Sequence, residues 1–254
     1  MTDARYRFRQ PAPPKAADPW DGVLIVDKPP GITSHDVVDR IRRTFGIAKV
    51  GHGGTLDPQA TGVLIMLLGR GTKLSDHFIG SDKVYEGTLR LGIATDSYDA
   101  DGKVVSEADS SRVTQEQVDA EMKKLTGDLL HVPPMVSAVK VDGIPLYKRA
   151  RKGQTIERKA RLVHVYEFKL LRFDPPRAEF RMRCTKGTYV RKLCHDVGEA
   201  LGCGAHLERL RRTVSGSITI EQAAPLDEVL RMDREALRSR IIPISRFGRL
   251  PGTA

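Results

Sequence analysis

One aspartate stands out as a group that could do chemistry. Asp57 lies in the stretch "VGHGGTLDPQATGVLIMLLG" at residues 50–69, where it is surrounded by glycines and followed by a long apolar run. Glycine lets the backbone approach a ligand closely, which a loop pressed against a substrate needs and an ordinary turn does not. An Asp-Pro pair is also common in turns. The residues alone therefore leave both a catalytic and a turn role open.

Several reaction classes lack their usual sequence patterns. Neither "GHGGTLDPQATG" nor "GRGTK" has the Gly-Lys-Ser/Thr ending of a phosphate-binding loop, so NTP hydrolysis is not expected. The sequence shows no nucleophilic triad, no H-E-x-x-H motif and no evident pair of carboxylates at one site. A mechanism here would depend on one acid helped by basic or aromatic side chains.

Composition limits the partner and the compartment. The 254 residues include 42 Lys and Arg against 32 Asp and Glu, a formal charge of +10. That charge favours a polyanion and leaves RNA, DNA and anionic membrane open. The longest apolar run, Val63 to Leu68, is far shorter than the roughly 20 residues of a membrane-spanning helix.

The cysteines favour a reducing compartment. Cys184, Cys194 and Cys203 form neither an even disulfide framework nor a C-x-x-C pair, so we expect buried or idle thiols in a cytoplasmic protein. With His195 and His206 they match no metal-ligand spacing, and we expect no metal.

The spacing of apolar residues predicts the strands and helices that must position Asp57. Residues 22–27 predict a buried strand, and residues 33–46 predict a helix that begins at the capping pair Thr33 and Asp36 and ends at Gly46. Further strands are predicted at 63–68, 82–93, about 162–173 and 177–184, and further helices at 114–127 and 188–202. Long alternating strands joined by hairpins indicate an α+β fold with a largely antiparallel sheet flanked by helices.

Three other segments have distinctive composition. "TDSYDADGKV" at residues 95–104 departs from the EF-hand pattern and is better explained by a turn at Asp101-Gly102. Residues 131–161, the basic segment, carry seven Lys or Arg between 148 and 161, which favours either an RNA-binding excursion or a solvated charged face. Residues 1–20 resemble a disordered basic tail with no secretory signal.

Together these blocks resemble one known family, the bacterial tRNA pseudouridine-55 synthases of the TruB family. The catalytic motif of that family is similar to "GHGGTLDPQATGVL". The other matching blocks, in order, are "VDKPPGITS", "SDKVYEGTLRLG", "TDSYDADG", "PPMVSAVKVDG" and "CTKGTYVRKLCHDVGEALGCGAHLERLRR".

The resemblance covers about residues 21–245. It implies one catalytic domain over that range, with the pseudouridine-synthase fold and a mixed, largely antiparallel central sheet flanked by helices and loops. Many family members carry a PUA-type RNA-binding domain after the catalytic one. Residues 246–254 are too few to form a complete domain of that type.

The resemblance implies an essential acid at Asp57. It would act as the nucleophile or, in an alternative route, as the base that gives a glycal, and the sequence does not choose between them. Arg191 matches the arginine that pairs with this acid, and a close guanidinium lowers an aspartate pKa by about 1 to 3. By itself, Arg191 could equally be a solvated residue on a helix face.

The resemblance also implies a pocket for one base. Tyr85 matches the tyrosine that stacks on the flipped uracil and takes part in proton removal, Tyr189 a second pocket tyrosine, and Leu210 an apolar wall. His52 matches a histidine that contacts the RNA loop. Without the resemblance, Tyr85 and Leu210 would be assigned to the core and His52 to the surface. For Lys28, bracing the loop and touching substrate both remain open.

The partner implied is the T-arm stem-loop of tRNA, with no cofactor, no membrane and no obligate protein partner. Phosphate contacts would come from the basic segment and from the arginines that follow Leu210, and they would make affinity fall with salt. The residues expected in this role are Lys148, Arg149, Arg151, Lys152, Arg211 and Arg212.

Overall fold

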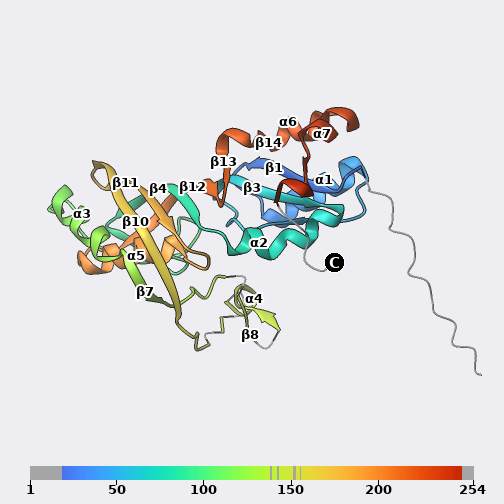
Figure 1. The fold of residues 1–254 in the computed structure, drawn as a ribbon. Coiled ribbons are helices and arrows are strands. Elements are labelled where there is room, and N and C mark those ends of the chain that lie inside the picture. The colour runs from blue at the N-terminus through green and yellow to red at the C-terminus, as the bar shows by residue number, and fades with distance from the viewer. Residues whose placement is uncertain (1–18, 138, 142, 151–152, 155, 248–254) are drawn as a thin grey trace, which may run out of the picture.

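The computed structural model describes residues 19–137, 139–141, 143–150, 153–154 and 156–247. It confirms the α+β class: a long mixed sheet runs through the molecule, with helices packed on its faces (Figure 1). In spatial order, the main path of this sheet is β14 (Ala224–Pro225), β1 (Gly22–Lys28), β3 (Thr61–Leu68), β12 (Ala205–Ser215), β4 (Lys83–Leu91), β11 (Arg177–Cys184), β10 (Arg161–Asp174) and β7 (Gly127–His131).

Short strands extend this path. Strand β2 (Val50–His52) pairs with β3, β13 (Ile218–Thr219) with β12, and β15 (Ile242–Pro243) with β1. Among the pairings recorded in this sheet, β1–β14 and β3–β12 are parallel and the others are antiparallel, as expected for a mixed, largely antiparallel sheet. Two hairpins stand apart from it: β5 (Ile93–Thr95) with β6 (Val104–Glu107), and β8 (Lys140–Val141) with β9 (Ile144–Pro145).

One half of the sheet is covered by α1 (Ser34–Phe45), α6 (Leu226–Arg231) and α7 (Arg234–Arg240). Helix α1 begins and ends where the sequence predicts. Thr33 and Asp36 form a reciprocal capping box, and Gly46 ends the helix in the left-handed conformation. Its apolar face, formed by Val37, Val38, Ile41 and Phe45, is buried against β1 and β3, so this helix is fixed next to the segment that carries Asp57.

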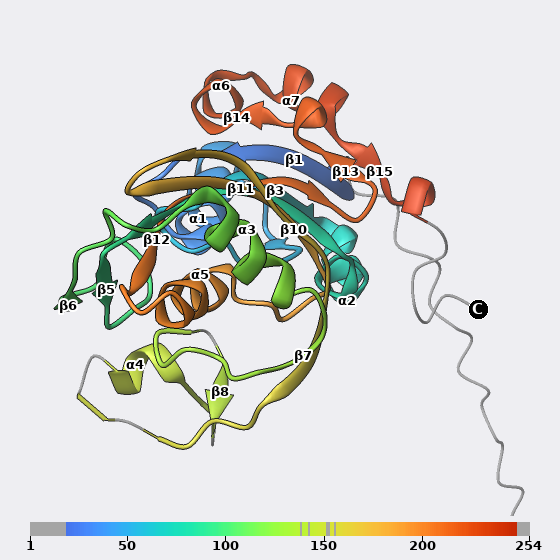
Figure 2. The same cartoon turned by 90° about the vertical axis from the view of Figure 1, so that its left-hand side faces the viewer.

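The other half is covered by α3 (Gln115–Lys124) and α5 (Val190–Ala200), which pack on β4, β10, β11 and β12 (Figure 2). A third apolar cluster joins β1 and β3 to η1 (Gly69–Leu74), α2 (Ser75–Gly80) and η3 (Ile244–Phe247). The remaining 3-10 helix is η2 (Ile220–Gln222).

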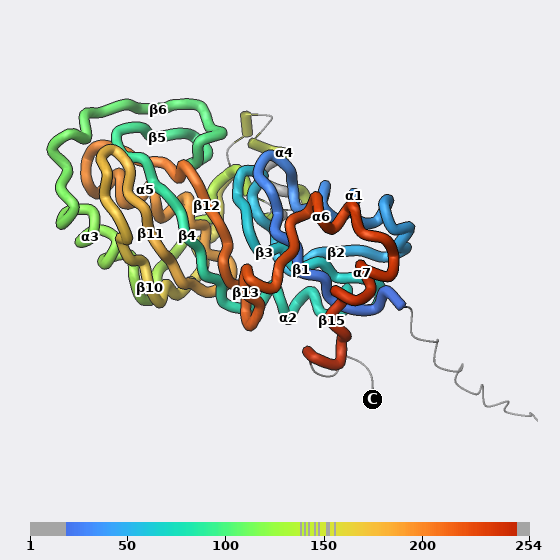
Figure 3. The backbone as a smooth tube through the Cα atoms, turned by 90° about the horizontal axis from the view of Figure 1, so that it is seen from above, coloured from blue at the N-terminus to red at the C-terminus, as the bar shows by residue number. Residues whose placement is uncertain are grey.

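The two halves meet where β3 runs beside β12, near the middle of the molecule (Figure 3). Gly62 makes this contact possible: an added Cβ would lie 2.2 Å from the carbonyl oxygen of Arg212, and its φ is +99°. The described part of the basic segment holds β8, β9 and the short helix α4 (Leu146–Ala150), which are set off from the main sheet and lie below it in Figure 1.

Two residues assigned from sequence to the tails are packed against the rest of the chain. Trp20, assigned from sequence to a disordered tail, is 7% exposed and packs in the α1 core, with its ring centroid 6.5 Å from that of Phe45. Phe247 packs edge-on against Phe78 at 5.1 Å, so ordered packing continues past residue 245. Residues 1–18 and 248–254 lie outside the described residues.

Two composition-based expectations can be compared with the structure. The three cysteines are free and buried, as expected. Among the described residues, no helix is both long enough and apolar enough to cross a bilayer.

Candidate active site

The Asp57 loop, residues 53–60, connects β2 to β3 and is held by side chains from other elements. Leu56 and Ala60 are buried in the core at either side of Asp57. Ser34, at the start of α1, accepts a hydrogen bond from the Leu56 backbone N–H at 2.9 Å and donates to its carbonyl at 3.2 Å. The Asp57 backbone carbonyl accepts from Ala60 N–H at 3.1 Å, which closes the turn.

Lys28 holds the other side of this loop. Its side chain is fully buried, and Nζ donates to the carbonyls of Pro29, Ile32 and Pro58 at 2.7–2.8 Å. Burial lowers the pKa of Lys28 to about 8. An ammonium has three N–H donors, and all three are used here. Lys28 is therefore a brace of the Asp57 loop, one of the two roles left open by the sequence.

Arg212 is a second brace, and this corrects our expectation of a phosphate contact. The residue is 1% exposed, and its guanidinium donates to the carbonyls of Val63 at 2.8 Å, Gly54 at 3.1 Å and Thr55 at 3.3 Å. A buried arginine must find partners for its charge and its donors, and these carbonyls supply them. Arg212 thus ties strand β12 to the start of the Asp57 loop and to the strand β3 that follows it.

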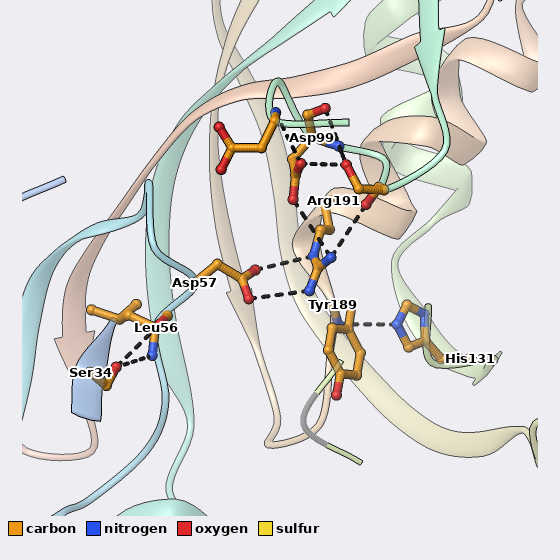
Figure 4. Close-up of polar contacts among 9 residues, drawn as sticks. Ser34, Leu56, Asp57, Asp99, His131, Tyr189 and Arg191 are labelled. Atoms are coloured by element: carbon orange, nitrogen blue, oxygen red, sulfur yellow. Dashed lines mark hydrogen bonds and ion pairs between the residues drawn. The ribbon is translucent and has the colours of Figure 1, made fainter. Parts of the chain in front are cut away.

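Asp57 forms a bidentate ion pair with Arg191 from α5 (Figure 4). Arg191 Nε lies 3.1 Å from one carboxylate oxygen, and a terminal nitrogen donates to the other at 3.2 Å. The third nitrogen donates to the Ser97 carbonyl at 3.3 Å and lies 3.6 Å from the Asp99 carboxylate. The guanidinium, whose side chain is 3% exposed, is therefore held between two acids.

The pKa of Asp57 differs in direction from our expectation. Burial raises the pKa of this carboxyl above its ordinary value, and the nearby Asp99 raises it further, although Arg191 and Lys28 oppose the change. The side chain remains 42% exposed, because one side of the carboxylate faces an open cavity while the walls exclude water from the other. Arg191 limits the rise in this pKa but does not reverse it.

The cavity beside Asp57 brings together most of the predicted pocket residues. It has a volume of about 570 Å³, and Asp57, Arg191, Tyr85, Tyr189 and Leu210 all line it. Tyr85 on β4 and Leu210 on β12 pack against the cores of both halves of the sheet. Arg191 lies over the Tyr189 ring, with 5.7 Å from its guanidinium carbon to the ring centroid.

Both pocket tyrosines are neutral phenols at physiological pH. Burial raises the pKa of Tyr85 and of Tyr189, although nearby arginines oppose the change in each case. Each ring therefore offers a flat apolar face and a hydroxyl, which suits stacking on a planar base.

His52 lies outside the lining of this cavity. It ends β2 and is half-buried, and its Nδ1 accepts from Gly54 N–H at 3.4 Å. Burial and the charge of Arg212 lower the pKa of His52, which favours a neutral imidazole.

The expected phosphate-binding residues are dispersed. Lys148 on α4 is exposed, whereas Arg149 is half-buried and donates to the Val141 carbonyl at 3.3 Å. Arg211 forms a bidentate ion pair with Asp27 at 2.6 and 3.1 Å while 41% of its side chain stays exposed. Arg151 and Lys152 lie outside the described residues.

Two site residues were missed by sequence reasoning. Asp99 lies in the β5–β6 connection, where only the turn at Asp101-Gly102 was predicted. His131 accepts the backbone N–H of Tyr189 at 3.0 Å. The three acids of "TDSYDADG" were a signal for Asp99, but nothing in the sequence indicates that this hairpin reaches Arg191.

Comparison with known proteins decides the family. Residues 42–190 match the model of the TruB family pseudouridylate synthase N-terminal domain, and residues 191–247 match that of the tRNA pseudouridylate synthase B C-terminal domain. The chain belongs to the TruB family of pseudouridylate synthases. TruB-family membership makes it an isomerase and establishes pseudouridine formation in tRNA as its reaction.

Relatives of the TruB family named tRNA pseudouridine synthase B are similar over most of the chain. The Opitutus terrae protein is 50% identical over 88% of this chain and 93% of its own length, and the Burkholderia mallei protein is 44% identical over 92% and 75%.

A solved structure gives the same fold. A chain of a Cbf5-Nop10-Gar1 complex is 31% identical with a TM-score of 0.71, matched over 90% of this chain and 61% of that one. A chain of an H/ACA RNP bound to a substrate RNA containing 2'-deoxyuridine is 28% identical with a TM-score of 0.67, matched over 89% and 60%. The TruB-family chain therefore spans about three fifths of these solved chains.

Proposed function

We propose that this enzyme isomerises uridine 55 in the T-arm of tRNA, with Asp57 as the acid that acts on the flipped nucleotide. One observation carries the proposal. The Asp57 carboxylate faces a cavity of about 570 Å³ while ion-paired to Arg191, and two tyrosines and Leu210 form the walls. A cavity of this size falls within the range of small-molecule sites, which is roughly 300–1,000 Å³.

The reaction needs an ionised carboxylate. The bond from uracil N1 to ribose C1′ breaks, the base turns, and a bond from C5 to C1′ forms. The C5 proton leaves and N1 is protonated, so the product is an isomer of the substrate. Asp57 acts either as the nucleophile or as the base that removes a ribose proton, and both routes begin from the anion.

Flipping the target base out of the T-loop costs a few kcal/mol. Stacking on Tyr85 offsets part of this cost, since base–aromatic stacking contributes roughly 1 to 3 kcal/mol. The Tyr85 hydroxyl takes part in proton removal, the Tyr189 hydroxyl helps to hold the base and the acid, and His52 contacts the loop from which the base has left.

The T-arm backbone is held by the basic segment. Lys148 is exposed on α4, in the part of the chain set off from the main sheet (Figure 1). Outside the basic segment, Arg211 keeps two fifths of its side chain exposed beside the Asp57 loop. Phosphate contacts of this kind position the RNA without reading its sequence. We place this activity in the cytoplasm, where the buried free thiols of Cys184, Cys194 and Cys203 stay reduced.

The test uses T-arm transcript tritiated at uracil C5. Wild-type protein is expected to release tritium, and Asp57→Asn, which keeps the shape but not the charge, is expected to release none. A transcript with cytidine at position 55, tritiated at its other uracils, serves as the control and should release none with either protein. A wild-type protein that binds the T-arm without releasing tritium would instead be an RNA-binding protein on the same fold, and the proposal would be wrong.

A further inference from the structure

His131 joins the basic segment to the candidate active site. It ends β7 and is 3% exposed. Its Nε2 accepts a hydrogen bond from the backbone N–H of Tyr189 at 3.0 Å, and its ring stacks on the Tyr189 ring with centroids 5.9 Å apart and planes inclined by 11° (Figure 4). The imidazole therefore contacts both the backbone and the side chain of a residue that lines the cavity.

Tyr189 is the N-cap of α5, the residue just before Val190. The first N–H groups of a helix have no partner inside the helix, and Tyr189 itself supplies no side-chain cap. His131 provides an acceptor for the first of these groups. Arg191 follows two residues later on the same turn, so the same contact sets where the Tyr189 ring and the Arg191 guanidinium leave the backbone.

This contact requires an unprotonated Nε2. A protonated imidazole has two donors and no acceptor, so its Nε2 would repel the Tyr189 N–H. Burial and the charge of Lys192 lower the pKa of His131 to about 4, while Asp196 opposes the change. Lys192 and Asp196 form an ion pair on α5, and Arg161 lies directly across from His131 on β10, exposed to solvent. The surroundings therefore keep the imidazole neutral.

We propose that His131 is a positioning residue: its neutral imidazole, through the Tyr189 backbone and ring, keeps the pocket tyrosine and Arg191 in register with Asp57. The inference rests on the proposed function. It assigns His131 no contact with the RNA or with the reacting atoms.

Two substitutions separate this role from simple space filling. His131→Leu fills much of the space but accepts no hydrogen bond, whereas the amide oxygen of His131→Gln can accept the Tyr189 N–H. We expect His131→Leu to lower kcat for tritium release about 100-fold, as a small displacement of catalytic groups does, and to leave KM nearly unchanged. His131→Gln should recover most of that loss.

His164→Gln is the matched control. His164 lies on β10, 39% exposed, and pairs with Asp128. We expect its kcat and KM to equal those of the wild type. Melting of each variant at pH 7 shows whether it is folded.

Nitrogen-15 spectra of histidine-labelled protein provide a measurement that does not depend on activity. The His131 signals are those present in the wild type and absent from His131→Gln. At pH 7 they should show a neutral imidazole with the proton on Nδ1. A protonated Nε2 at pH 7 would overturn the inference, as would wild-type kcat in folded His131→Leu, or a folded His131→Gln as slow as the Leu variant. Absence of tritium release by the wild type would instead count against the proposed function, and the spectra would still decide the role of His131.

Discussion

Two opposing effects, burial and the charge of Arg191, determine the pKa of the Asp57 carboxyl. From the sequence we expected Arg191 to lower the pKa of Asp57, and the structure gives a pKa above the ordinary value. Removing water from a carboxylate favours its neutral form, and here that effect exceeds the attraction of the guanidinium. Asp99 contributes in the same direction, because it shares Arg191 and carries the same charge as Asp57.

A first prediction concerns Asp99→Asn. Removing this charge should lower the pKa of Asp57. The ionised form of Asp57 is lost as pH falls through its pKa, so activity should persist to lower pH in the variant than in the wild type. The measurement is the acid limb of kcat against pH for tritium release.

Asp101→Asn is the control for this experiment. Asp101 lies in the same hairpin connection, and it is exposed. Its substitution should leave the acid limb in place. An acid limb that moves to higher pH in Asp99→Asn would contradict the electrostatic account.

At the scale of elements, the Asp57 loop is fixed by three side chains from outside it. Lys28 comes from the end of β1, Ser34 from the start of α1 and Arg212 from β12, and each binds loop backbone groups. Because the anchors reach both sides of Asp57, the carboxylate is held before substrate arrives. Such preorganisation is what a reaction that depends on one acid requires.

A second prediction tests the approach of β3 to β12 with Gly62→Ala. The added methyl would meet the Arg212 carbonyl, and the positive φ is unfavourable for alanine. Gly127→Ala is the matched control, since Gly127 has a φ of +89° with open space where a Cβ would lie. Its positive φ alone should cost roughly 1 kcal/mol.

Chemical denaturation measures the difference. Gly62→Ala should lower the free energy of unfolding by about 1 to 3 kcal/mol more than Gly127→Ala does, which is the range for forcing extra volume into a packed site. Tritium release should fall as well, because Arg212 would shift away from the Asp57 loop. Equal stability of the two variants would mean that the strands can separate without cost.

At the scale of the whole molecule, the site exists only because both halves of the sheet are joined. The two family models meet between residues 190 and 191, inside the first turn of α5. Asp57, Tyr85 and Tyr189 come from the first model, and Arg191 and Leu210 come from the second. The sheet crosses this boundary through β12, which pairs with both β3 and β4, so the two matched regions share one sheet.

A third prediction addresses the basic segment. Each phosphate contact adds about 0.7 to 0.9 to the slope of log affinity against log salt. For T-arm RNA, Lys148→Ala should therefore reduce the magnitude of that slope by about 0.7 to 0.9, the contribution of one contact. It should leave kcat at saturating RNA unchanged. Lys124→Ala, exposed on α3, is the control and should keep the wild-type slope. Affinity that does not change with salt in the wild type would exclude phosphate tracking altogether.

The sequence by itself determined the main strands and helices around the site and pointed to Asp57 as the candidate acid. Local signals were sufficient for α1, because Thr33, Asp36 and Gly46 satisfy the ends of the helix through neighbouring residues. They were also sufficient for β1, β3, β10 and β11, whose apolar patterns match their burial. The resemblance named Asp57, Arg191, Tyr85, Tyr189 and Leu210, and the structure places all five around one cavity.

Only the tertiary structure decided what surrounds these groups. Arg212 is buried and binds the Asp57 loop, and Asp99 contacts Arg191 from the β5–β6 hairpin. His131 binds Tyr189, which is 58 positions later in the chain. The local sequence around a charged residue in a basic stretch does not show whether its side chain faces solvent or the interior. Its role depends on which carbonyls, acids and rings the folded sheet brings within hydrogen-bond distance, and that information is not local in sequence.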